Sequence, residues 1–96
     1  MSEKRDAFVK KIKASIDEWN AEIDRLKARA EQAEAEARIE YHDEIQELKN
    51  YRDDARKRLS RLEQAGEGAW EDMKAGVEMA FEAMSQAVSS ARNRFK

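Results

Sequence analysis

The stretch VKKIKASIDEWNAEIDRLKARAEQAEAEA, residues 9–37, decides the expected fold. Its apolar and alanine positions recur at gaps that alternate between three and four residues, which is the spacing of a left-handed coiled coil. These positions are Val9, Ile12, Ile16, Trp19, Ile23, Leu26, Ala30, Ala33 and Ala37. We therefore expect a helix whose apolar seam packs against at least one other helix.

No Pro or Gly interrupts residues 3–65, so we predict one unbroken helix over this range, with Ser2 as its N-cap. Such a helix would be roughly 95 Å long. After Ala37 the next two gaps, to Tyr41 and Ile45, are four residues each, which is a stutter in the supercoil. A hairpin turn within residues 28–37 is the alternative. We expect the continuous helix because Ala, Glu, Gln and Arg, which fill that segment, all favour helix.

The only turn signal in the chain is Gly66-Glu67-Gly68. Glycine after the last apolar position of a helical run is typical of a helix end, so we predict a glycine hinge at residues 66–68. A second amphipathic helix is expected over residues 69–95. Its apolar face is wide enough to pack against more than one helix.

Charge blocks favour one topology. If the second helix folds back at the hinge, residue i faces about residue 134 − i, and acidic residues then face basic ones along the hairpin. If the first helix instead folded on itself near residue 33, the basic block 4–13 would lie on residues 53–62, which are also basic. Each exposed pair contributes only about 0.2–1 kcal/mol, but a dozen pairs can select between topologies. We therefore predict the fold-back at the glycines only.

This arrangement leaves the N-terminal half without a partner in its own chain. An antiparallel dimer crossing near residues 24 and 25 would set block 4–13 against the acidic residues 36–45 of a second copy. We therefore expect an elongated antiparallel homodimer, with a trimeric or tetrameric bundle as the alternative. The sequence leaves open the oligomer number and whether helix 69–95 packs on its own chain or swaps between chains.

The predicted fold is thus all-α, a single helical domain over residues 1–96. A long helix and a shorter C-terminal helix form a helical hairpin, assembled as a coiled-coil homo-oligomer. The large apolar residues of both stripes are expected in the core or in the self-association seam. They are Ile12, Ile16, Trp19, Ile23, Leu26, Tyr41, Ile45, Leu48, Leu59, Leu62, Trp70, Met73, Val77, Phe81, Met84 and Val88.

Composition argues against most catalytic and metal chemistry. The chain has no Cys, which excludes disulfides, thiolate zinc ligands and thiol nucleophiles. His42 is the only histidine, and the positions where a helical metal site needs its partner hold Ile39 and Gln46. Glutamates 36, 40, 44 and 47 are predicted to form a solvated face rather than a cation site. We expect no enzymatic activity, no cofactor and no metal.

Two surfaces suggest other partners. The basic run between Arg52 and Arg61 is interrupted by Asp53 and Asp54, so we do not expect nucleic acid to bind there. Helix 69–95, with Trp70 and Phe81, is the alternative anchor of a peripheral membrane protein, although its acidic polar face would be repelled by anionic lipids. No secretory signal or membrane-spanning run is visible, so we predict a cytoplasmic location.

Four segments carry a resemblance that covers nearly the whole chain: MSEKRDAF at residues 1–8, DEWNAEI at 17–23, ARIEY at 37–41 and AWEDMKAGVEMAFEAM at 69–84. Together they resemble a family of small bacterial coiled-coil proteins often labelled stress-response proteins. The resemblance implies a helical, cytosolic and non-enzymatic protein. We therefore predict a self-associating coiled-coil module with a structural or protein-interaction role linked to stress, whose protein partner is unknown.

Overall fold

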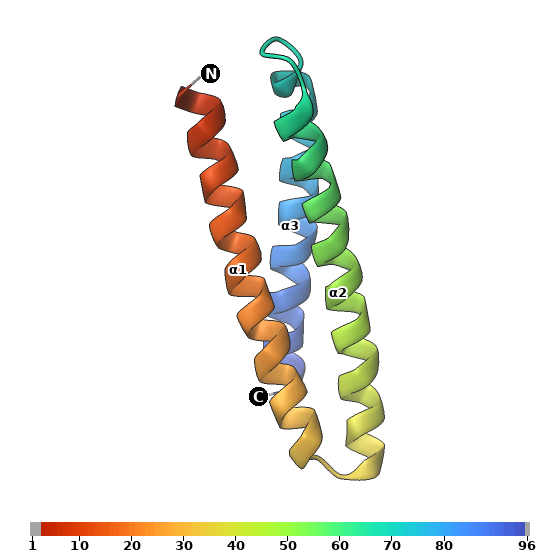
Figure 1. Ribbon diagram of the computed structural model, residues 1–96. Helices are drawn as coiled ribbons and strands as arrows, with labels where there is room; N and C mark the ends of the chain where they lie inside the picture. Colours follow the sequence, from red (N-terminus) through yellow and green to blue (C-terminus); the bar gives the residue numbers. More distant parts are fainter. Residues whose placement is uncertain (1–2, 96) are drawn as a thin grey trace.

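The computed structural model describes residues 3–95, which form three α-helices joined by two short turns (Figure 1). Helix α1 spans Glu3–Gln32, α2 spans Ala35–Gln64 and α3 spans Trp70–Arg94. The chain runs along the bundle, returns, and runs along it again, giving a rod with extents of 51 × 19 × 16 Å. The all-α prediction is confirmed for the described residues, whereas the predicted N-cap Ser2 lies outside them.

The predicted unbroken helix over residues 3–65 is wrong. Ala33 and Glu34 interrupt it, and α2 returns along α1 as an antiparallel neighbour. A straight helix would leave its apolar stripe in water, whereas the hairpin buries Ile23 and Leu48 to 1% and 0% exposure. Each such side chain contributes about 1.5–3 kcal/mol on burial, which exceeds the value of any exposed charge pair. Hydrophobic burial therefore outweighs both the helix propensity of residues 28–37 and the charge argument.

The two basic blocks do become neighbours, but their charges find other partners. Lys13 pairs with Glu63 across the α1–α2 hairpin at 3.3 Å. Arg5 donates to the backbone carbonyl of Glu63, and Arg52 donates to the side-chain oxygen of Asn20 at 3.0 Å. The carboxylate and the backbone carbonyl of Glu63 and the side-chain amide of Asn20 therefore offset the repulsion expected between the basic residues. A comparison of net charge by block leaves these groups out.

The α2–α3 turn lies where the glycines predict it, and α3 folds back as expected. Tyr41 stacks on Phe95 with ring centroids 4.1 Å apart, within two residues of the predicted register. The turn geometry differs from a left-handed glycine cap, because neither Gly66 nor Gly68 has a positive φ. Instead, Ala65 is extended, with φ −73° and ψ 150°, and the Ala69 amide donates to the carbonyl of Gly66.

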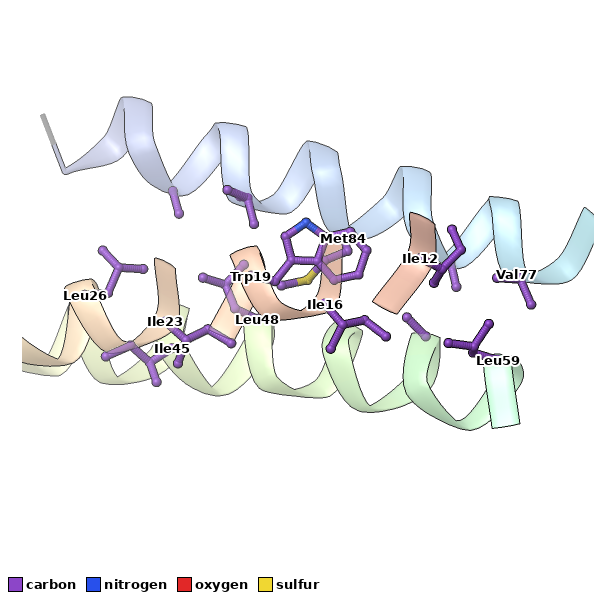
Figure 2. Close-up of a cluster of buried hydrophobic side chains, with 14 of the residues drawn as sticks. Ile12, Ile16, Trp19, Ile23, Leu26, Ile45, Leu48, Leu59, Val77 and Met84 are labelled. Carbon is purple, nitrogen blue, oxygen red and sulfur yellow. The ribbon is translucent and has the colours of Figure 1, made fainter. Parts of the chain in front are cut away.

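One apolar cluster runs the length of the bundle and includes Trp19 of α1, Leu48 of α2 and Met84 of α3 (Figure 2). Most of the predicted core residues are buried in it: Ile12, Ile16, Trp19, Ile23, Leu26, Ile45, Leu48, Leu59, Leu62, Trp70, Val77, Met84 and Val88. Tyr41, Met73 and Phe81 are half-buried and pack against it. The α1 seam is thus covered within one chain, so the premise that the N-terminal half has no partner in its own chain is wrong. The homodimer itself stays a prediction.

Candidate functional site

A depression lies between the C-terminal half of α1 and the N-terminal half of α2, and has a volume of about 520 Å³. No residue of α3 lines it, so it opens on the side of the hairpin that α3 leaves uncovered. We call it the α1–α2 groove. Its lining residues are Lys27, Ala30, Glu31, Arg38, His42, Ile45, Gln46 and Lys49.

Helical spacing builds the two walls of the groove. On α2, residues 38, 42, 45 and 49 follow one another at gaps of four, three and four, so their side chains form one line along the helix. Ala30 and Ile45 make the floor, with 5% and 4% exposure. Because Ala30 is small, α1 is thin at this point and the depression stays open.

The groove is positively charged. Lys27, Arg38 and Lys49 oppose only Glu31 among its lining residues. Arg38 is occupied, since its guanidinium donates to the carbonyls of Ala30 at 3.3 Å and Ala33 at 3.1 Å. Over residues 3–95, neither Lys27 nor Lys49 forms an ion pair. Two amino groups above an apolar floor can therefore receive carboxylates from outside the bundle.

An exposed apolar side chain borders this groove. Ile39 is 64% exposed. It lies three residues before His42 and seven before Gln46, so it shares the groove side of α2. The groove thus combines an apolar floor, an apolar edge and a cationic rim.

A second depression of about 420 Å³ continues the α1–α2 seam toward the other end of the bundle, and again no α3 residue lines it. It lies between Lys13 and Asp17 of α1 and Arg56 and Glu63 of α2, so its charges are mixed. The Asn20–Arg52 hydrogen bond lies between the two depressions along both helices. The part of the seam that favours an anionic partner is therefore the α1–α2 groove.

Two acids are buried where the C-terminal end of α3 meets the other helices. Glu22 of α1 pairs with Arg92, and Glu44 of α2 pairs with Arg94 at 3.6 Å. The hydrogen bond from Arg92 lowers the pKa of Glu22 against the opposing effect of burial. Burial, reinforced by the nearby charge of Glu47, raises the pKa of Glu44, and Arg94 offsets only part of that. The Glu22–Arg92 pair therefore holds α3 against α1, whereas Arg94 only partly offsets the cost of burying the charge of Glu44.

Possible metal ligands do not gather into a site. His42 is exposed in the α1–α2 groove, and Glu44 of the acidic series is paired with Arg94. Within residues 3–95, no group of three or more His, Cys, Asp or Glu side chains lies close enough together to hold a metal ion.

The predicted site residues and the groove residues share only Ile45. The other predicted residues are core or hinge positions, whereas Lys27 and Lys49 were not singled out from the sequence. One signal was readable, because Arg38, His42 and Lys49 form a polar line beside the α2 seam. Their approach to Lys27 could not be foreseen, because it depends on the turn at Ala33 and Glu34.

Comparison of the chain with protein-family models, curated proteins and solved structures gives no match. The resemblance to small bacterial stress-response coiled coils therefore stays a prediction. Across the described helices, none combines the length and apolar character needed to cross a membrane.

Proposed function

We propose that the chain is a non-enzymatic protein-interaction module that binds an acidic amphipathic helix of a partner protein in the α1–α2 groove. The observation that carries this proposal is that Lys27 and Lys49, which form no ion pair within residues 3–95, lie above the apolar floor of Ala30 and Ile45. An amphipathic helix in a groove between two helices is a common mode of peptide recognition.

The bound helix would take the place of a fourth helix on the hairpin, opposite α3. Its apolar residues, spaced three or four apart, would contact Ala30, Ile45 and the exposed Ile39. Its flanking Glu or Asp side chains would meet Lys27 and Lys49. A basic helix is disfavoured by the same two lysines, so the groove discriminates by charge.

The expected affinity is modest. Ion pairs at an exposed rim contribute about 0.2–1 kcal/mol each and act mainly on the association rate. Covering Ile39 and the floor adds on the order of 2 kcal/mol of apolar burial. Because binding must also order a flexible helix, we expect dissociation constants on the order of micromolar.

The test uses a fluorescein-labelled 18-residue peptide with leucines at helical spacing flanked by glutamates, followed by fluorescence anisotropy. The double variant Lys27→Glu with Lys49→Glu is expected to weaken binding at least tenfold. The matched control, Lys10→Glu with Lys57→Glu, makes the same charge change at exposed lysines that line none of the described depressions, and should bind like the wild type. Equal weakening in both variants, or equal binding of a lysine-flanked isomer of the peptide, would contradict the proposal.

The alternative role as a membrane anchor lacks a comparable observation. The apolar face of α3 already packs into the core, with Trp70 and Met84 at 5% and 0% exposure. Insertion into a membrane interface would require α3 to leave α1 and α2. Flotation with liposomes tests this alternative directly, because binding of the intact protein would favour it over the groove.

A further inference from the structure

We propose that α1 exchanges between two copies of this chain. The turn at Ala33 and Glu34 straightens, residues 3–64 become one helix of each copy, and each α1 packs on the α2 and α3 of the other copy. The result is a two-fold symmetric antiparallel dimer made of two re-formed bundles. This inference goes beyond the groove and does not depend on it.

The turn itself is the first argument. Residues 28–37 read ARAEQAEAEA, without the Gly, Pro, Asn, Asp or Ser that turns favour. Ala, Arg, Gln and Glu are among the best helix formers. The local sequence of the turn therefore favours the straight helix, and only the packing of the hairpin opposes it.

The capping of the turn is the second argument. Glu34, the N-cap residue of α2, makes no side-chain capping hydrogen bond. At the end of α1, the carbonyls of Ala30 and Ala33 accept hydrogen bonds from the single side chain of Arg38. Straightening replaces these contacts by the regular backbone hydrogen bonds of a helix, so little is lost when the turn opens.

The seam continues through the turn, which is the third argument. The alternating three- and four-residue gaps run without interruption from Leu26 through Ala30, Ala33 and Ala37. In a continuous helix of about 93 Å these alanines lie at the centre, where the two long helices of the dimer cross. Their small side chains permit a close crossing of the two backbones.

Apart from the Arg38 hydrogen bonds at the turn, release of α1 costs no contact, because exchange re-forms the contacts of α1 between chains. The Lys13–Glu63 ion pair, the Asn20–Arg52 hydrogen bond and the Glu22–Arg92 pair are all made across the two copies. Helix α1 packs mainly on α2, and it also contacts α3 through the Phe8–Trp70 and Trp19–Phe81 ring pairs. The equilibrium between the closed chain and the exchanged dimer is thus decided at the turn and by concentration.

Cross-linking distinguishes exchange from any other association. The chain has no Cys, so Lys13→Cys with Glu63→Cys introduces the only two thiols, at exposed positions that face each other. The dimer fraction from size exclusion is treated with a short bismaleimide. Exchange predicts that the cross-link joins two chains and gives a covalent dimer on a denaturing gel. A dimer fraction whose cross-links lie only within single chains overturns the exchange and leaves the groove proposal standing.

Variants at the turn give an independent readout. Glu34 has φ −68° and ψ 160°, which proline adopts readily in the closed turn but not inside a helix. Glu34→Pro should raise the dimer dissociation constant by roughly four orders of magnitude, one proline penalty for each copy. Glu34→Gln, which changes only the charge, should leave it unchanged, and Arg38→Ala should shift the equilibrium toward dimer. Wild-type chain that stays monomeric at millimolar concentration, or dimers that Glu34→Pro does not weaken, would overturn the proposal.

Discussion

The two turns of this bundle are made in opposite ways. Between α2 and α3, the exposed Gly66-Glu67-Gly68 segment marks the turn in the sequence, and the chain reverses there. Between α1 and α2, the chain reverses at Ala33 and Glu34, within a segment of strong helix formers. The α2–α3 turn is specified locally, whereas the α1–α2 turn is imposed by the apolar surfaces that it brings together.

At the end of the bundle with the weaker turn, the start of α2 contacts the end of α3. Tyr41 stacks there on Phe95 with ring centroids 4.1 Å apart. This contact fixes the start of α2 against the end of α3, so the turn does not have to be stable by itself. Stability at this end comes from residues distant in sequence, which is why local signals miss it.

The largest effect is expected from a substitution in the apolar packing that imposes the α1–α2 turn. Ile23→Ala removes a side chain that is 1% exposed between α1 and α2, and should lower the free energy of unfolding by about 2–5 kcal/mol. Urea denaturation, monitored by circular dichroism, measures this loss of unfolding free energy. The control Met79→Ala truncates a side chain that is 71% exposed and should change stability by less than about 0.5 kcal/mol.

Proline substitutions separate the turn from the helix that follows it. Glu40→Pro, at an exposed position inside α2, should cost about 3 kcal/mol of unfolding free energy because it removes a helical hydrogen bond and clashes with the preceding turn. Glu34→Pro should instead stabilise the closed monomer by about 0.4–1 kcal/mol, since its backbone already has a proline-like φ. Thermal and urea unfolding at low protein concentration measure the stability of both proline variants relative to the wild type. A destabilised Glu34→Pro variant would show that the reversal does not occur at this residue.

The glycine turn should tolerate side chains. A Cβ added at Gly66 or Gly68 would meet no atom within 4 Å, and neither residue has a positive φ. Gly66→Ala and Gly68→Ala are therefore expected to raise the free energy of unfolding by about 0.4–1 kcal/mol, through a less flexible unfolded chain. A loss of about 1 kcal/mol in either variant would indicate a left-handed glycine and contradict the described turn.

The smallest effects are expected at the two buried acids that face α3, and their signs differ. The lowered pKa of Glu22 means that its charged form stabilises the fold above the ordinary pKa of a glutamate, and that this stabilisation is lost as pH falls through the lowered value. The raised pKa of Glu44 means that its stabilising contribution lies at low pH and is lost as pH rises through the folded pKa. At pH 7, Glu22→Gln should lower Tm and Glu44→Gln should raise it. Calorimetry from pH 3 to pH 8 checks both, and shifts of the same sign at pH 7 would contradict this assignment.

The sequence predicts much of this fold. Period and composition identify the helices, Gly66 marks the second turn, and the register of α3 on α2 agrees with the Tyr41–Phe95 contact. The turn at Ala33 could not be predicted, because the three–four repeat passes through it unchanged. Counting charges by block was also misleading, since Lys13 pairs with Glu63 beside a basic block. The groove could not be predicted without the α1–α2 turn, because Lys27 of α1 reaches the side chains of α2 only after the chain reverses.

The reversal at Ala33 and Glu34 is tested most directly by the separation of residues 13 and 63 within one chain. Spin labels at these positions, diluted with unlabelled protein at low concentration, report that separation by electron paramagnetic resonance. The closed bundle predicts neighbouring helices with axes about 10 Å apart and strong dipolar coupling between the labels. A single distance near 75 Å, the length of fifty helical residues, would mean that α1 and α2 are one continuous helix and would contradict the bundle.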